Sequence, residues 1–498
     1  MSYKLDLSGI DRDSETSLTQ QLVDLFTGAI EAGSLGPGEK LPTTRALAAE
    51  AGVNHLTAAR VYRRLAEMGF VTATVGRGTF VRQLMPAAGE QGDDWQVYAL
   101  PDRPIAYAEQ VLGDAFRFAG DPSVISLSTG HPAPETFPVD ELARITADVF
   151  REAGSEAISY LVPEGLWELR EQIAERGRAR GFASDPQEIV VTSGARQALD
   201  LIAREVLEPG EVCVAETPSF IGMLSSLRST GARVIGIPVD ADGLDVDALE
   251  EVLARHEVRL VALQPRCHNP TGADLSAERR ARLADLAVQR NFFILEDAVY
   301  ADMRFEGEGL RPVRELAPSH TIYVNSLSKT VGGGLRAGWV AARGPILERL
   351  TALKMDTDFH TATLVQHIAA RYLASGAYDR HVKASIPFYR ERRDVLLEAL
   401  DTHLAGEYRA ERPSGGHHVW LTLTRPVNER ELYTEALRHG VTFTPGGVIS
   451  VERPAQSSLR LSFSMRSPDE LVEGVKRLAR ALREVRRRDR HAATLPVS

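Results

Sequence analysis

The chain has 498 residues, and at roughly 100 to 200 residues per domain this length predicts two to four folded units rather than one. Hydrophobic residues make up 43% and charged residues 25%, values ordinary for globular proteins that exclude a disordered or fibrous chain. The sequence has no apolar run near the roughly 20 residues of a membrane helix, and its polar, acidic start does not resemble a signal sequence. We therefore expect a soluble, cytoplasmic protein without a membrane partner, in which Cys213 and Cys267 serve packing.

The net charge of -10 is unevenly distributed along the chain. Residues 1–39 hold two basic and seven acidic side chains, whereas residues 40–84 hold seven basic and two acidic ones. A local excess of positive charge is the electrostatic footprint of nucleic-acid binding. The segment 40–84 therefore remains a candidate for DNA binding in spite of the acidic total.

The first 84 residues predict three helices followed by two short strands. Leu18, Leu22 and Phe26 belong to an apolar stripe at helical spacing. Thr43 and Thr44 can cap a short helix that Gly52 ends, and a further helix begins near Asn54 and ends at Gly69. Two alternating runs, FVTATV and GTFVRQL, then flank Gly76-Arg77-Gly78, which predicts a hairpin or wing.

The line PGEKLPTTRALAAEAGVNHLTAARVYRRLAEMGFVTATVGRGTFV resembles the DNA-binding domain of the GntR family of winged-helix repressors. The resemblance implies a winged helix-turn-helix domain over 12–84 that binds half-sites of double-stranded DNA. The residues that it places at the DNA are Thr44, Arg45, Asn54, His55, Thr57, Arg77 and Gly78. Asn54-His55 stands where the family usually has Ser-Arg at the start of the recognition helix, so we expect an unusual operator. Arg63 and Arg64 could equally form a solvated helix face.

Residues 85–106 are rich in Pro, Gly, Gln and Asp without periodicity, which predicts an interdomain linker. Residues 107–498 alternate helical patterns with short apolar runs, which predicts an α/β unit with a largely parallel sheet covered on both faces. The predicted strands are EIVVTSG, EVCVAETP, RVIGIPVD, RLVALQP, FFILED, TIYVNSLS and RAGWVAA. Active sites in such sheets lie at the carboxyl ends of the strands.

Three features fall at those strand ends. The turn Ser193-Gly194-Ala195 enters a helix and can present backbone N–H groups to an anion such as phosphate. Glu296 and Asp297 follow a buried strand, where a carboxylate usually pairs with a cation. Lys329, one of only six lysines, ends another strand beside glycines, so it is either a surface lysine or an amine that forms a Schiff base.

Together these segments resemble the class I/II aminotransferases of fold type I, which bind pyridoxal 5'-phosphate (PLP), over most of residues 107–480. The quoted pieces include QPRCHNPTG, EDAVYADM, NSLSKTVGGGLRAGWV and LRLSFS. The resemblance implies a PLP-dependent transferase domain over 107–498, with a large lobe at about 160–345 and a smaller second lobe from the flanking segments. It also implies an internal aldimine of PLP on Lys329 as the catalytic residue.

The resemblance assigns the remaining cofactor contacts residue by residue. Asp297 would pair with the pyridine nitrogen, Asn269 and Tyr300 with the 3-oxygen, and Phe220 would stack on the ring. The phosphate would be held by Gly194, Ala195, Arg196 through its backbone, Ser326, Ser328 and Arg336, with Tyr160 reaching the site of a neighbouring subunit.

Arg460 would bind a ligand carboxylate, and Gly130 would line the ligand side. Phe220 as a core aromatic and Arg460 facing water remain alternatives. We expect no metal site, because His417 and His418 should face opposite sides of a strand and no further ligand set has suitable spacing.

A winged helix joined by a linker to an aminotransferase-like domain is the architecture of the MocR/GabR regulators, which this chain resembles from end to end. The resemblance implies a PLP-dependent transcriptional regulator of amino-acid, amine or vitamin B6 metabolism. Its effector would be an amino compound or PLP itself. The regulator would be a homodimer, with a domain-swapped head-to-tail arrangement as one option. Two alternatives stay open: an active aminotransferase that carries a DNA-binding domain, and a repressor that uses the second domain only for dimerisation.

Overall fold

The computed structural model describes residues 10–12, 14, 16–31, 35, 39–68, 70–74, 78–81, 107–118, 120–183, 185–307, 309–452, 454 and 456–494. The chain divides into two compact units, residues 1–105 and 106–498, and each is described by itself. Arg77 and the expected linker, 85–106, lie outside the described residues. Among the helices that are described, none has the length and apolar character needed to cross a membrane.

The N-terminal unit contains three helices and a two-stranded antiparallel sheet, in the order that the sequence predicts. They are α1 (Leu18–Glu31), α2 (Thr44–Ala51), α3 (His55–Glu67), β1 (Val71–Thr74) and β2 (Gly78–Val81). Its buried core includes Leu22, Phe26, Leu47, Val61 and Leu65. The apolar stripe of α1 therefore packs against the inner faces of α2 and α3, which leaves the charged face of α3 exposed.

Local capping sets the tight turn between α2 and α3. Thr43 Oγ1 accepts a hydrogen bond from the Ala46 N–H at 3.2 Å, and Gly52 ends α2 in the left-handed region with φ +61°. Asn54 Oδ1 then accepts from the Thr57 N–H at 2.7 Å and begins α3. The predicted helix-turn-helix is confirmed.

The C-terminal unit is built on an eight-stranded sheet in the order β4-β11-β10-β9-β8-β5-β6-β7. The strands are β4 (Ile189–Thr192), β5 (Val212–Thr217), β6 (Arg233–Asp240), β7 (Gly243–Leu244), β8 (Val258–Leu263), β9 (Phe293–Asp297), β10 (Thr321–Ser326) and β11 (Gly338–Ala341). All seven predicted strands lie in it. The largely parallel sheet is confirmed, although β11 runs antiparallel to both neighbours and β7 antiparallel to β6.

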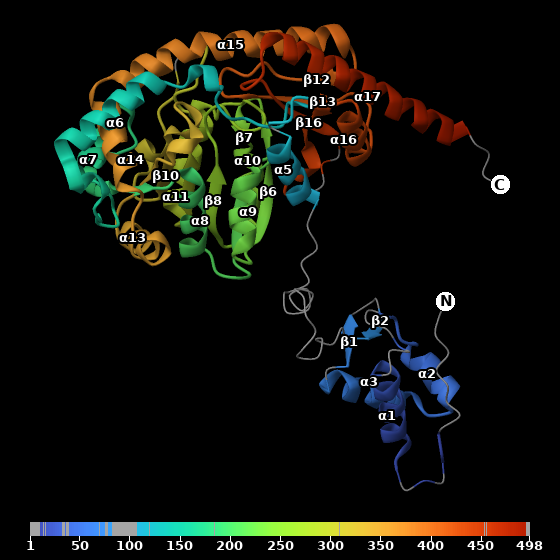
Figure 1. The fold of residues 1–498 in the computed structure, drawn as a ribbon. Helices are drawn as coiled ribbons and strands as arrows, with labels where there is room; N and C mark the ends of the chain where they lie inside the picture. The colour runs from blue at the N-terminus through green and yellow to red at the C-terminus, as the bar shows by residue number, and fades with distance from the viewer. Residues whose placement is uncertain are drawn as a thin grey trace. The chain divides into compact units, whose positions relative to one another are not determined.

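Helices cover both faces of this sheet (Figure 1). One face packs on α8 (Ala195–Val206), α9 (Ile221–Ser229) and α13 (Pro345–Asp358), and the other on α10 (Val246–Arg255), α11 (Ala277–Arg290) and α12 (Val313–Leu316). Along β5, Cys213 and Ala215 face α8 and α9, whereas Val214 faces the opposite layer. Because successive side chains alternate, a strand buried on both faces reads as one continuous apolar run.

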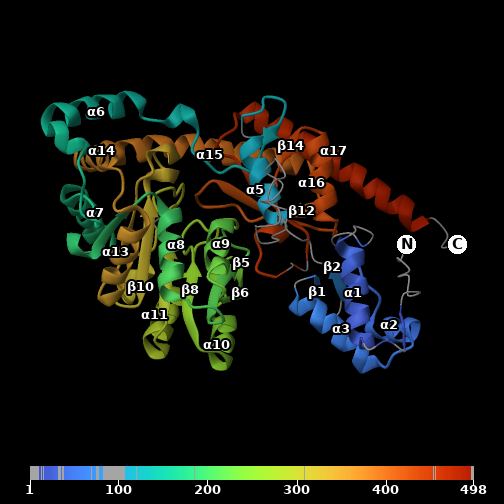
Figure 2. The ribbon, with the colours of Figure 1, turned by 60° about the horizontal axis from the view of Figure 1, so that its bottom comes forward.

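Two further groups of helices complete the unit. Over β4 and β11 lie α6 (Val139–Ala153), α7 (Trp167–Arg180) and α14 (Thr363–Ala374). At the other end, α15 (Ala377–His403), α16 (Glu429–Arg438) and α17 (Pro468–Thr494) cover a four-stranded antiparallel sheet in the order β12-β13-β16-β15 (Figure 2). These strands are β12 (Tyr408–Arg409), β13 (His418–Leu423), β15 (Thr444–Pro445) and β16 (Ser458–Ser462).

The smaller lobe also draws on residues before the large sheet. Helix α5 (Tyr107–Arg117) precedes β3 (Ile125–Ser126), which pairs in parallel with β14 (Val441–Thr442). The short 3-10 turns of the unit are η1 (Pro134–Thr136), η2 (Gly154–Ile158), η3 (Pro186–Glu188), η4 (Leu327–Lys329), η5 (Gly333–Leu335) and η6 (Gly446–Val448). The segment after β3 thereby reaches the edge of the large sheet where the predicted site residues gather.

Candidate functional site

The predicted site residues gather at one edge of the large sheet. Asp297 ends β9, Ser326 ends β10, and the chain then turns through η4 to Lys329. Nearby, β4 passes through Gly194 into the first turn of α8. The carboxyl ends of the strands thus meet as expected for a doubly covered sheet.

Lys329 lines a cavity together with Asp297 and Arg336. Its Nζ donates a hydrogen bond to the Gly130 carbonyl oxygen at 3.0 Å and lies 5.8 Å from the centre of the Tyr300 ring. Burial lowers the pKa of Lys329 to about 8, the Arg460 charge adds to this lowering, and Asp297 opposes it. A lysine with this pKa is partly neutral near physiological pH, so its nitrogen can act as a nucleophile.

The two adjacent carboxylates of β9 have different surroundings. Glu296 accepts the backbone N–H groups of Val313 and Arg314 on α12, which gives it a structural role. Asp297 accepts hydrogen bonds from Gln264 Nε2 at 2.7 Å and from the Val299 N–H at 3.2 Å. Burial raises the pKa of Asp297 to about 6 in spite of these hydrogen bonds. A buried carboxylate in this state is stabilised by a nearby cation.

The turn into α8 is shaped as a cradle. Gly194, the residue before α8, has φ +95° and no side chain that could cap the helix. The first N–H groups of α8 therefore have no partner within the helix. A Cβ on Gly194 would stand 2.9 Å from Arg336 Nη2, whose guanidinium also donates to the Ser193 carbonyl. On the facing turn, the Ser328 N–H donates to Ser326 Oγ at 3.3 Å. Backbone donors, hydroxyls and one guanidinium therefore converge where an anion would be favoured.

Arg460 is buried beside this site and does not face water. Its Nη1 donates to Asn269 Oδ1 at 3.1 Å and its Nη2 to Thr444 Oγ1 at 3.0 Å, while its buried Nε has no hydrogen-bond partner. Burial lowers the pKa of Arg460 to about 10, and Tyr300 opposes this effect. A desolvated guanidinium with neutral partners is a strong site for a carboxylate.

Both histidines of the 417–418 pair approach Tyr300. The Tyr300 hydroxyl and His418 Nε2 lie 3.1 Å apart, and the two imidazoles lie edge-on to the Tyr300 ring at 5.3 and 5.9 Å. The strand pairing continues at His417, because the Phe463 N–H donates a hydrogen bond to the His417 carbonyl oxygen at 3.1 Å. A Cβ on Gly130 would collide with the His418 ring, so glycine is required there.

Two cavities adjoin at Lys329. The smaller, about 170 Å³, is lined by Asp297, Tyr300, Ser326, Ser328 and Arg336 among others. The larger, about 660 Å³, is lined by Arg460, Gly130 and His418 and extends between α5 and α9. Phe220, Asn269 and Arg196 line both. Phe220 therefore has one face on a cavity and is not a purely core aromatic.

The smaller cavity fits PLP on observations of this chain alone. It combines the buried carboxylate of Asp297, whose hydrogen bonds come from neutral groups, with the nucleophilic amine of Lys329. Beside Arg336 it also has the Gly194 turn, where a Cβ would fill the space. Lys329, Asp297 and Arg336 could hold its aldehyde, ring nitrogen and phosphate. Gln264 is a contact that the sequence interpretation missed, although it ends a predicted strand and the same strand-end rule applies to it.

Tyr160 lines neither of the two cavities that adjoin at Lys329. Its side chain is 87% exposed and contacts the His360 ring edge-on at 5.5 Å. Within one chain it therefore has no part in the site that contains Lys329.

Five of the predicted DNA-contacting residues lie at the starts of α2 and α3. Arg45, Asn54 and His55 are exposed, while Thr44 and Thr57 are half-buried. Gly78 has φ +123°, and a Cβ there would meet the Lys40 side chain. Leu56, which the sequence interpretation passed over, is 73% exposed beside His55. Its apolar side chain at a recognition-helix N-terminus has the chemistry that contacts a thymine methyl group.

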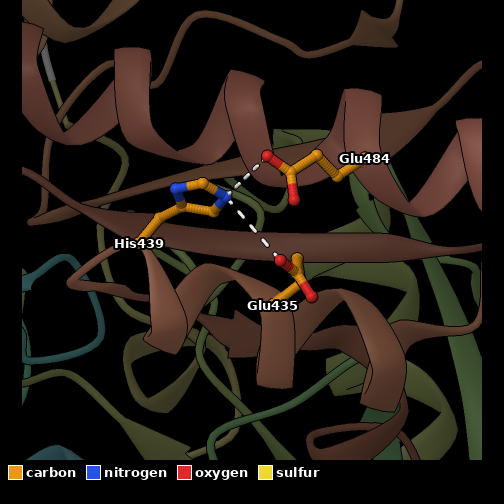
Figure 3. Close-up of side chains that lie close together, drawn as sticks. All are labelled: Glu435, His439 and Glu484. Atoms are coloured by element: carbon orange, nitrogen blue, oxygen red, sulfur yellow. Dashed lines mark ion pairs between the residues drawn. The ribbon is translucent and has the colours of Figure 1, made fainter.

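One group of potential metal ligands occurs among the described residues. Glu435, His439 and Glu484 bring ligand atoms within 4.8 Å of one another between α16 and α17 (Figure 3). Glu435 already accepts Arg488 Nη1 at 2.8 Å and Arg438 Nη1 at 3.1 Å. These arginines supply the positive charge that a cation would bring, so the group is accounted for as an ion-pair network.

The fold and this site define a class of protein, a winged-helix DNA-binding unit joined to a fold type I aminotransferase-type unit. Comparison with known proteins assigns each part. The family of aminotransferases class I and II matches residues 122–478, and the bacterial regulatory proteins of the gntR family match residues 18–81. The chain belongs to the aminotransferase class I and II family and carries a gntR-family domain, the combination expected of a MocR-type regulator.

Individual proteins resemble the second unit or the whole chain. Aromatic-amino-acid aminotransferase 1 of Thermococcus litoralis is 34% identical over 76% of this chain and 94% of its own length. The probable rhizopine catabolism regulatory protein MocR of Rhizobium meliloti is 28% identical over 95% of each chain. The solved structure of LysN, the α-aminoadipate aminotransferase of Thermus thermophilus, complexed with N-(5'-phosphopyridoxyl)-L-leucine, has a TM-score of 0.70 at 33% identity, covering 77% of this chain and 99% of that one. PLP is the cofactor that the family and its solved members support.

Proposed function

We propose that this protein is a PLP-dependent, DNA-binding transcriptional regulator of amino-acid, amine or vitamin B6 metabolism. The observation that carries the proposal is the presence, in one chain, of a winged helix with an exposed basic recognition helix and of two cavities that adjoin at Lys329, one lined by Asp297 and the other by Arg460. The first part suits the reading of DNA and the second the binding of an amino compound.

PLP, when bound, supplies an aldehyde that condenses with amines and a ring that withdraws electrons. Lys329 would bind the aldehyde carbon, because its lowered pKa leaves its nitrogen partly unprotonated. Asp297 would hold positive charge at the ring nitrogen, and a cation there would offset the burial that raises the pKa of this carboxyl. Asn269 and Tyr300 would orient the 3-oxygen, and Phe220 would stack on the ring.

The phosphate would lie in the cradle at the start of α8. The groups that would hold it are the Ala195 and Arg196 N–H groups, the Ser326 and Ser328 hydroxyls, and the Arg336 guanidinium. Gly194 has no side chain, so the space beside Arg336 stays open for the phosphate. An effector amine would compete with Lys329 for the same carbon atom. Arg460 would bind the effector's carboxylate through guanidinium atoms, including the buried Nε that has no partner within the chain.

A homodimer would link ligand binding to DNA binding. Ile158, Tyr160, Val162 and Phe359 expose 56 to 87% of their area, and such a group of apolar side chains is typical of a protein interface. Tyr160 would then reach the phosphate of the neighbouring subunit. Two winged helices in one dimer would bind paired half-sites, and a ligand that favours one arrangement would shift the DNA affinity.

A second candidate function is transamination by the same site. The observation that favours it is the co-location of Lys329, Asp297, Asn269, Tyr300 and Arg460, a set that would also serve an enzyme. Conversion of an amino acid and a 2-oxo acid at typical enzyme rates, roughly 1 to 1,000 per second, would favour this reading over that of a sensor.

The test of the regulator is a map of the DNA protected by the full-length protein upstream of neighbouring genes. It is made without ligand, with PLP, and with PLP and candidate amines. We expect a defined site made of two half-sites whose protection changes with the amine. Protection that is absent, or that stays the same under all three conditions, would contradict the proposal.

A further inference from the structure

The lining of the larger cavity is basic. Its lining includes Lys329 and the guanidiniums of Arg196, Arg228 and Arg460, and none of its lining residues is acidic. Among the residues that the structure describes, these three arginines have no ion pair. Their hydrogen bonds go to backbone carbonyls, hydroxyls and one amide: Arg460 to Asn269, Thr444 and the Ser128 carbonyl, Arg196 to Ser225 and the Gly222 carbonyl, and Arg228 to the Ser450 and Val451 carbonyls.

A single ligand carboxylate would use only part of this positive charge. The α-carboxylate of an amino acid would be bound by Arg460, which lies deep in the cavity next to Asn269. The cofactor phosphate would be held at Arg336, which lines only the smaller cavity of the two. Arg196 and Arg228 are then left over as two cations that no part of the cofactor or of the α-amino acid group requires.

Arg196 and Arg228 stand together at the mouth of the cavity. Arg196 lies in the first turn of α8 and Arg228 in the last turn of α9, and Arg196 Nη2 donates to Ser225 Oγ at 3.2 Å. Ser225 and Ser229 are one helical turn apart on α9 and line the same cavity. Two guanidiniums and two hydroxyls thus offer several donors to one anionic group.

Apolar side chains form another part of the cavity lining. Ala108 and Val111 of α5, Ile221 of α9, and Val448 form the wall. Such a wall favours the carbon chain of a ligand and gives no partner to a polar group midway. The cavity therefore combines a buried carboxylate site at Arg460, an apolar wall, and a second cationic site at the exposed Arg196 and Arg228.

We propose that the amino compound bound beside Lys329 is an amino acid whose side chain ends in a second anionic group, read by Arg196 and Arg228. This inference rests on the proposed function, because it names the ligand of the same site. Carboxylate and phosphate ester groups share the required chemistry, and the experiment separates them.

The test uses the full-length protein loaded with PLP, and the absorbance of the bound cofactor reports amine binding without any need for turnover. The protein is titrated with L-aspartate, L-glutamate, L-2-aminoadipate and O-phospho-L-serine, each beside a neutral counterpart such as L-asparagine, L-glutamine, L-norleucine or L-serine. We expect at least one acidic ligand to bind about tenfold or more tightly than its counterpart, since charge-assisted hydrogen bonds exceed neutral ones. The acidic ligand that binds most tightly shows which side-chain length fits, and whether the second anionic group is a carboxylate or a phosphate ester.

Variants separate the two arginines from the rest of the site. In Arg228→Gln, the ratio of the affinity for the acidic ligand to that for its neutral counterpart should fall close to one. The affinity for the neutral counterpart should stay within about twofold of the wild type. Arg196→Gln should act in the same direction. Arg255→Gln, on α10 and paired with Glu251, is the matched control and should change neither affinity.

The outcomes are distinct. Equal affinity for every acidic ligand and its neutral counterpart, with clear spectral responses to both, overturns this inference and leaves the proposed function intact. Retention of the full preference in both arginine variants also overturns it. A protein with no cofactor absorbance and no response to any amine contradicts the proposed function, and this inference fails with it.

Discussion

Lys329 Nζ donates a hydrogen bond to the Gly130 carbonyl oxygen at 3.0 Å, which joins the turn after β10 to the segment after β3 in the smaller lobe. His417 Nδ1 lies 3.3 Å from the same oxygen. The amine at the centre of the site is thus held by a backbone group of the other lobe. Any group that takes the lysine nitrogen away from this oxygen changes a contact between the lobes.

Replacement of Lys329 by alanine should abolish covalent attachment of PLP. The reason is that the lowered pKa makes this lysine a better nucleophile than a solvated one at neutral pH. The measurement is mass spectrometry after borohydride reduction of the protein incubated with PLP. Lys383→Ala, an exposed lysine on α15, is the matched control and should retain one attached cofactor per chain. Equal attachment in both variants would show that another amine is modified.

Asp297 should give the cofactor-free protein a distinctive pH dependence of stability. Burial raises its pKa from 3.8 to about 6, so between these values the folded state binds more protons than the unfolded one. The stability that Asp297 contributes is therefore present below pH 4 and is lost as the pH rises through 6. At about 1.4 kcal/mol per pKa unit this amounts to about 3 kcal/mol.

Asp297→Asn removes this titration. We expect the difference in unfolding free energy between the variant and the wild type to move by about 3 kcal/mol in favour of the variant from pH 3 to pH 7. Urea unfolding of the cofactor-free proteins at several pH values measures it. A constant offset, such as a lost hydrogen bond from Gln264, would not change with pH. A flat difference would therefore show that Asp297 titrates near its ordinary value.

The sequence was sufficient to predict the strands and most of the strand-end residues, for physical reasons. A strand buried on both faces is a continuous apolar run, and Asp297, Ser326 and Lys329 follow such runs directly. The antiparallel direction of β11 was not predictable, because it depends on the long turn from Lys329 to Arg336 and not on the apolar pattern of the strand. Capping residues Thr43 and Asn54 were recognisable because they act on their own helix.

Contacts between distant segments could not be derived from local pattern. The burial of Arg460 follows from the pairing of β16 with β13 and β15, and the strand pattern alone left it free to face water. The same holds for Gly130 against His418, which lie 288 positions apart and meet only in the folded lobes. The cationic mouth of the larger cavity was missed for the same reason, since Arg196 and Arg228 belong to different helices.

Gly194→Ala should weaken PLP binding. The residue has φ +95°, where a Cβ is strained, and the added carbon would displace the Arg336 guanidinium from the cradle. We expect the dissociation constant for PLP to rise by about tenfold or more, equivalent to about 1.4 kcal/mol. Fluorescence or absorbance titration with PLP measures this change.

Gly333→Ala is the control for that substitution. Gly333 lines the same cavity, but a Cβ there meets nothing within 4 Å and its φ is not in the left-handed region. It should bind PLP within about twofold of the wild type, because no atom must move. Equal losses in the two variants would mean that flexibility of the turns, and not the cradle, determines the affinity.

Asn54 has two separable tasks, capping α3 and contacting DNA. Its Oδ1 already accepts the Thr57 N–H at 2.7 Å, so a bidentate contact to adenine would compete with the cap. Asn54→Ala should lower the unfolding free energy of the N-terminal unit by about 1 kcal/mol through loss of the cap. Asn54→Asp should keep the cap and the stability while the added negative charge weakens DNA binding. Thermal unfolding and DNA titrations at several salt concentrations measure the two effects. If Asn54→Asp retained full DNA affinity, the residue would serve the cap alone, and readout at the helix start would fall to His55 and Leu56.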